Sequence, residues 1–93
     1  MNENPSYRPG RDIVVATVDA MKAELKELIA SSTGNLTVDM SGVEMIDSKG
    51  LGLLIAASNT LGASARKLRI VGAVPDIVEL FRVMRLDRHF EID

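Results

Sequence analysis

Hydrophobic and polar residues follow a helical period in three segments of this 93-residue chain. Apolar side chains recur there every three or four positions, which is typical of helices that bury one face. The pattern predicts helices over residues 18–30, 48–62 and 75–84. Their apolar stripes are Val18, Met21, Leu25, Leu28 and Ile29 in the first helix, Leu51, Leu54, Ile55, Ser58 and Leu61 in the second, and Ile77, Leu80, Phe81 and Met84 in the third.

The segments between these helices carry strand patterns. Residues 35–40 alternate apolar and polar side chains, and residues 67–72 read similarly, so both predict strands. The β-prone run 13–16 and the terminal residues 89–92 predict two shorter strands. Strands that alternate with helices predict the α/β class, here a single domain with a mixed, mostly parallel β-sheet and helices packed against it.

Local signals mark the ends of the predicted helices. Thr17 offers a hydroxyl that could cap the first helix, and Gly34 suits a left-handed terminator after it. Gly62 is expected at the end of the second helix. Pro75 suits the first position of the third helix, because its missing N–H would have no intrahelical partner there. Met45, with its apolar neighbours, is expected to return the chain to the core before the second helix.

Length, charge and hydropathy narrow the class of protein. The length suits one domain, which we divide into an irregular N-terminal segment over residues 1–10 and the folded domain over residues 11–93. Eleven basic residues against 13 acidic ones give a formal net charge of −2, so we expect no nucleic-acid partner. Since no apolar run approaches the roughly 18–20 residues of a membrane span, we expect no direct membrane insertion. The polar N-terminus lacks a secretory signal, which predicts a cytoplasmic location.

The chain carries little catalytic equipment. It has no cysteine, and its one histidine is His89, so we expect neither a metal site nor a histidine-based relay. The order Ser48-Lys49-Gly50 does not match a phosphate-binding P-loop. Ile46 stands where a nucleophile elbow, G-x-S-x-G, has its first glycine. We therefore expect no catalytic residue, no cofactor and no enzyme activity.

The start of the second predicted helix has an unusual combination of residues: a carboxylate, a hydroxyl and two glycines. Asp47 and Ser48 lie at its entry, and either side chain could cap the unpaired N–H groups of the first turn. Gly50 and Gly52 each weaken that turn by about 1 kcal/mol relative to Ala. Two explanations stay open: a partner's backbone approaches the glycines closely, or the helix packs tightly on its own sheet.

A longer pattern contains this helix start. Residues 39–52 read D-x-S-G-V-x-x-I-D-S-x-G-L-G, and the segments 68–71 and 81–87 follow in order. Over residues 35–92 this arrangement resembles the STAS domain of bacterial anti-sigma factor antagonists.

The resemblance implies a partner-switching protein that regulates transcription through signal transduction. In that family the serine after the motif aspartate is phosphorylated by the anti-sigma factor, a serine kinase of the histidine-kinase-like ATPase fold, and a PP2C-type phosphatase removes the phosphate. The unmodified protein binds the kinase and releases what the kinase holds. Carried over, this makes Ser48 the phosphoacceptor and makes the chain a phosphoprotein. The partner-binding surface would contain Asp47, Ser48, Lys49, Gly50, Leu51 and Gly52.

A second function is compatible with the same resemblance. The chain could be a STAS-type accessory subunit of a multiprotein complex, such as a transporter or a biofilm or secretion regulator. Its interface would then be constitutive, and Ser48 would serve only as a cap.

Three positions depart from the family pattern. Gly10-Arg11-Asp12 comes close to the family's Gly-x-x-Asp element, but the segment before it is short. Lys49 stands where Ser or Thr is common, which leaves Ser48 as the single hydroxyl of the loop. Arg85 stands where many members have glycine before Leu-Asp, which predicts a small change at the end of the third helix.

Overall fold

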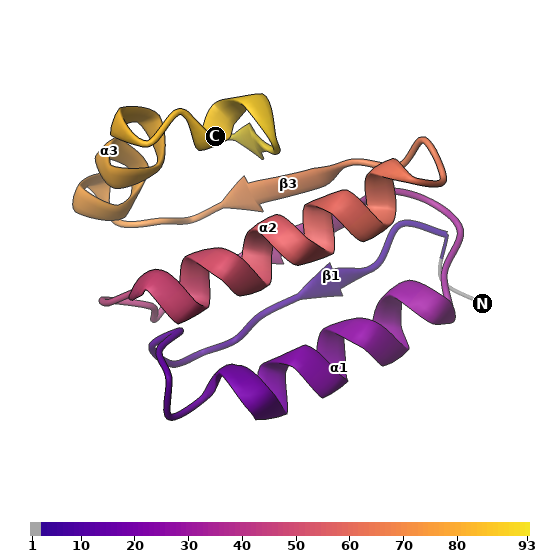
Figure 1. The fold of residues 1–93 in the computed structure, drawn as a ribbon, viewed down its shortest axis with the longest axis horizontal. Coiled ribbons are helices and arrows are strands. Elements are labelled where there is room, and N and C mark those ends of the chain that lie inside the picture. The colour runs from indigo at the N-terminus through magenta and orange to yellow at the C-terminus, as the bar shows by residue number, and fades with distance from the viewer. Residues whose placement is uncertain (1–2) are drawn as a thin grey trace.

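The computed structural model describes residues 3–93 and has eight elements of secondary structure (Figure 1). In chain order they are β1 (Ser6–Tyr7), α1 (Val18–Ala30), β2 (Leu36–Asp39), α2 (Ser48–Gly62), β3 (Leu68–Val71), α3 (Pro75–Val83), the 3₁₀ helix η1 (Leu86–Arg88) and β4 (Glu91–Ile92). The three predicted helices and the two longer predicted strands are confirmed.

One sheet joins the four strands in the order β1-β2-β3-β4, and each neighbouring pair is parallel. In its centre Leu36 pairs with Leu68 and Val38 pairs with Ile70. This confirms the α/β class with a mostly parallel sheet, and within residues 3–93 every strand pairing is parallel.

The three helices cover one face of this sheet. Leu36 and Val38 of β2 and Ile70 of β3 are fully buried in a single core cluster that contains residues of every helix. The residues that alternate with them, such as Thr37 and Arg69, are half-buried or exposed. A sheet whose strands follow chain order places its crossover helices on one face when the crossovers share one hand. All three helices therefore begin at the same edge of the sheet, where the strands end.

The helices bury or half-bury every residue of the predicted stripes except Met84. Met21 and Leu54 are buried on α1 and α2, and on α3 Phe81 packs against Phe90 edge to face, with ring centroids 5.5 Å apart. Met84 was expected in the core, but its side chain is 49% exposed. The reason is that α3 ends at Val83, so Met84 no longer follows the helical stripe. Within the described chain, no helix has the length and hydropathy of a membrane span.

The first strand differs from the expectation. Ile13 makes only one bridge, to Ile46, and residues 14–17 form a turn, so the apolar run 13–16 is not a strand. Residues 6–7 form β1 instead and pair with β2, which corrects the expectation that segment 1–10 is irregular throughout. Residues 1–2 lie outside the described residues, and the division of the chain at residue 11 stays a prediction.

Two of the expected helix-end signals act differently. Thr17 occupies the N-cap position of α1, but its hydroxyl donates to the Asp12 carbonyl oxygen (2.7 Å) and accepts from the Val14 N–H (3.1 Å), which stabilises the preceding turn. Gly34 does not have a positive φ. A Cβ there would lie 2.1 Å from the Asn4 side-chain oxygen, so the residue is small because the N-terminal segment crosses it.

Candidate functional site

The strand ends and helix starts gather at one edge of the sheet, and two carboxylates hold the loops there. Asp39 ends β2, and its Oδ1 accepts from the Ser41 N–H (3.0 Å) and the Ser41 hydroxyl (2.6 Å); these bonds, the side-chain bond first, lower the pKa of Asp39. Asp12 Oδ1 accepts from the N–H groups of Glu44 (2.9 Å) and Met45 (3.0 Å). The first half of the motif therefore fixes the loop that leads to α2.

Asp47 caps α2 and joins it to the turn before α1. Its Oδ1 accepts from the Gly50 N–H (2.9 Å), and its Oδ2 accepts from the Val15 N–H (2.9 Å). These two bonds, the Gly50 bond first, lower the pKa of Asp47. The carboxylate is therefore charged at neutral pH and is held by backbone groups from two segments. Of the two candidate caps, the structure assigns the role to Asp47.

Ser48 is left without a structural task for its side chain. It is the first residue of α2 and is exposed. None of the side-chain hydrogen bonds among residues 3–93 uses its hydroxyl, and the backbone on both sides is fixed by the Asp47 cap. A hydroxyl on a rigid, exposed helix start is well placed for a modifying enzyme to reach.

The two glycines of the helix start have different causes. A Cβ on Gly50 would lie 2.1 Å from the Ile13 carbonyl oxygen and 2.8 Å from Ile46 Cγ1, so tight packing within the chain explains this glycine. A Cβ on Gly52 would meet no atom within 4 Å, and the residue is exposed. Internal packing therefore does not explain Gly52, and close approach by a partner remains available for it.

The six predicted contact residues divide between surface and interior. Ser48, Lys49 and Gly52 are exposed, and Asp47 is half-buried. Gly50 and Leu51 are buried beneath them, so they shape the helix start without offering a surface of their own. The structure thus brings four of the six to the surface.

Sequence reasoning missed two exposed apolar residues beside this helix start. The side chains of Val15 and Met45 are 68% and 63% exposed. Their backbones are tied to the site, because the Val15 N–H bonds to Asp47, and the Met45 carbonyl oxygen accepts from the Ile13 N–H (3.1 Å). Met45 was expected in the core and Val15 in a strand, because an apolar residue type alone does not distinguish an interior from an exposed position. The flanking aspartates are the signal that could have placed them at the surface.

The one histidine of the chain, His89, lies away from Ser48 along α2. The His89 carbonyl oxygen accepts from the Ser58 hydroxyl, and Ser58 lies ten residues along α2 from Ser48, which is about 15 Å of helix. The sole histidine is therefore not a base for Ser48. Over residues 3–93 there is no group of three metal-ligating side chains.

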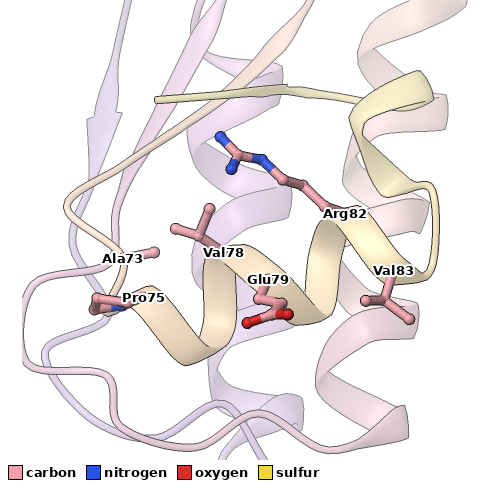
Figure 2. Close-up of a pocket in the computed structure, with 6 residues that line it drawn as sticks. All are labelled: Ala73, Pro75, Val78, Glu79, Arg82 and Val83. Carbon is pink, nitrogen blue, oxygen red and sulfur yellow. The ribbon is translucent and has the colours of Figure 1, made fainter.

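A hollow of about 650 Å³ lies along α3 (Figure 2). The charged side chains that line it, Glu79 and Arg82, point away from each other in Figure 2, and Val83 faces a third direction. No pair of groups converges there on a common point. The hollow therefore lacks the arrangement that acid and base catalysis requires.

Comparisons with known proteins agree with this geometry. The family model described as Mlab, STAS domain matches residues 12–92 of the chain. Two curated proteins are similar, the anti-sigma-F factor antagonist RsfB of Mycobacterium tuberculosis strain CDC 1551 / Oshkosh and that of strain ATCC 25618 / H37Rv. Each is 30% identical over 83 residues, which cover 89% of this chain and 67% of the relative.

Proposed function

The chain belongs to the STAS domain family, and on this premise we propose that it is an anti-sigma factor antagonist whose binding is switched by phosphorylation of Ser48. The observation that carries the proposal is the exposed Ser48 hydroxyl, which has no hydrogen bond among the described residues and follows the Asp47 cap. The similarity to an antagonist of an anti-sigma factor supports the same role. In this role the chain is a regulatory protein of the cytoplasm and not an enzyme, and Ser48 is a substrate.

In the unphosphorylated state, the surface around Ser48 binds the partner. Val15 and Met45 supply exposed apolar area on the loops tied to the start of α2, and Gly52 allows close approach on the helix. Removal of exposed apolar area from water favours association. The surface has this character without any change in the fold, so binding needs no unfolding step.

The partner that the proposal requires is an anti-sigma factor with serine-kinase activity of the histidine-kinase-like ATPase fold. It transfers the γ-phosphoryl group of ATP to the Ser48 oxygen, the hydroxyl proton leaves, and ADP is released. A PP2C-type phosphatase hydrolyses the ester and returns the hydroxyl and inorganic phosphate. This chain supplies only the positioned hydroxyl.

Phosphorylation reverses binding through charge. It adds about −1.5 to −2 charges at Ser48, which nearly doubles the formal net charge of −2 and concentrates the increase at one point. Asp47 already carries a negative charge beside Ser48, because its hydrogen bonds, the Gly50 bond first, lower its pKa, so the phosphate adds to an existing charge of the same sign. The helix N-terminus tolerates the phosphate, so we expect the fold to persist while the interface is lost.

The first experiment combines phosphorylation with binding. The protein is incubated with the cognate kinase and ATP, and mass spectrometry locates the phosphate; we expect it on Ser48 and on no other residue. Ser48→Ala should bind the kinase constitutively, and Ser48→Glu should lose binding in calorimetry. Ser64→Glu is the matched control, because Ser64 is exposed just beyond the other end of α2.

Two results would contradict the proposal. Phosphate on a different residue would remove Ser48 from the switch. Undiminished binding by Ser48→Glu, together with co-purification that does not depend on ATP, would instead favour the constitutive interface of an accessory subunit.

A further inference from the structure

The helices α1 and α2 lie side by side (Figure 1), and a groove lies between them. Its volume is about 550 Å³. Leu25 and Ile29 of α1 and Leu53 of α2 form its apolar floor. The floor residues belong to the core cluster, so the groove is a stable feature of the fold.

The rim of the groove has one sign of charge. Lys22, Lys26 and Lys49 line it, and no carboxylate is among the lining side chains. All three lysines are exposed, and none takes part in an ion pair among residues 3–93. The chain as a whole is acidic, so this local excess of positive charge selects for an acidic occupant.

The dimensions and walls of the groove favour a helix as its occupant. The lining residues of α2 run from Ser48 to Thr60, which is about 18 Å of helix and matches about twelve residues of a second helix. Both walls are helices whose backbone groups are already paired internally, so an extended peptide would find no partners there for its own N–H and C=O groups. A helix satisfies its backbone itself. Gly52 and Ala56 keep the α2 wall low, which allows close approach.

We propose that the groove between α1 and α2 binds an acidic, amphipathic helix of a partner protein, with apolar side chains on its floor and carboxylates at Lys22, Lys26 and Lys49. Ser48 lines one end of the groove, so it is continuous with the surface assigned to the switch. The inference rests on the proposed function only in naming the owner of the helix, which is the protein that binds at Ser48. The helix adds affinity through apolar burial and selects the partner through charge.

The probe is a synthetic peptide of 14 residues with blocked ends. It carries leucines at helical spacing and glutamates on the opposite face. Two control peptides have lysine in place of glutamate, or the same composition with the leucine order scrambled. Fluorescence anisotropy gives the Kd, and amide shifts of the ¹⁵N-labelled protein locate the site. We expect the acidic peptide to shift residues of α1 and α2 around Leu25 and Leu53, and to lose affinity as salt is raised.

Charge reversal tests the rim directly. The double variant Lys22→Glu with Lys26→Glu should raise the Kd of the acidic peptide about tenfold, which corresponds to about 1.4 kcal/mol. Lys67→Glu is the matched control, because Lys67 is exposed and does not line the groove. It should leave the Kd within about twofold of the unchanged protein. Circular dichroism of each variant checks that the fold is retained.

Several outcomes would overturn the inference. Equal affinity for the lysine peptide, equal affinity for the scrambled peptide, or shifts outside α1 and α2 would each do so. Binding of dodecanoate in the groove without binding of the peptide would assign the site to a lipid. Dimerisation of the protein alone, abolished by the double variant, would assign it to a second copy. The assay contains no kinase and leaves Ser48 unmodified, so its failure is distinct from failure of the phosphorylation switch.

Discussion

The two glycines at the start of α2 should respond to alanine in opposite directions. Gly52→Ala places a methyl group in open space at an exposed helical position. Alanine is favoured over glycine in a helix by about 0.8–1 kcal/mol, so the free energy of unfolding should rise by about that amount. For a domain of this size, 1 kcal/mol corresponds to about 4–8 °C in Tm.

Gly50→Ala places its methyl group 2.1 Å from the Ile13 carbonyl oxygen. That oxygen is backbone, and it accepts a hydrogen bond from the Asp47 N–H (3.3 Å), so it cannot move aside without loss of the contact. Overpacking of this kind costs about 1–3 kcal/mol or more, which exceeds the gain in helix propensity. We expect a net loss of about 1–2 kcal/mol and a fall in Tm of about 4–16 °C.

Urea unfolding followed by circular dichroism measures both variants, with the wild-type protein alongside. Equal or higher stability of Gly50→Ala would refute the packing account of this glycine. Lower stability of Gly52→Ala would show that the position is constrained within the chain. If Gly52 serves close approach by a partner, the same stabilised variant should bind the kinase more weakly.

Three further changes test other parts of the structure. Arg85 has a φ of +58°, a conformation that glycine adopts at lower cost. Arg85→Gly should therefore raise the free energy of unfolding by about 1 kcal/mol in thermal melts, whereas the control Arg88→Gly should not. A loss of stability in Arg85→Gly would contradict this explanation. The lowered pKa of Asp47 means that the charged cap stabilises the fold above about pH 4 and that this stabilisation is lost as the pH falls through the folded-state pKa, below 3.8. Asp47→Asn should therefore flatten the acid limb of Tm against pH, and an unchanged limb would argue against the cap. The double variant Val15→Ser with Met45→Ser should raise the Kd for the kinase about tenfold in calorimetry. Its Tm should change little, because both side chains are exposed. A large fall in Tm would place these side chains in the core.

The sequence predicts the helices and the two central strands well because their signals are local. A buried stripe such as Met21 and Leu25 follows from helical geometry alone, and the structure confirms it. The first strand has no such signal. Ser6 and Tyr7 form β1 only because β2 offers them backbone partners, whereas the more β-prone run at residues 13–16 meets a turn. The strand β1 is therefore a product of tertiary contacts that propensity does not show, whereas the equally short β4 (Glu91–Ile92) lies within the strand predicted over residues 89–92.

The structure explains why Arg85, at the end of α3, stands at a position where glycine is common. The sequence alone shows the departure from glycine at Arg85 but gives no physical reason for the family's preference. The left-handed backbone of Arg85 explains the preference, because glycine adopts that conformation without steric cost. The chain turns there, which exposes Met84 and lets Leu86 enter the core. The error at Met84 and the departure at Arg85 are therefore one feature, a helix that ends at Val83, one residue before its predicted end.

The sequence locates the candidate site at the start of α2 but does not show which side chain caps the helix and which side chains are exposed. The letters Asp47-Ser48 mark a helix start, and the structure is needed to show that one side chain caps and the other is exposed. Likewise, burial in a core and burial in an interface use the same driving force, so the apolar side chain of Met45 predicts a core position until its exposure is known. The distinction has an experimental form. A core residue changes folding and binding together when it is truncated, whereas an exposed interface residue changes binding without loss of stability. We expect Val15, Met45 and Gly52 to behave in the second way.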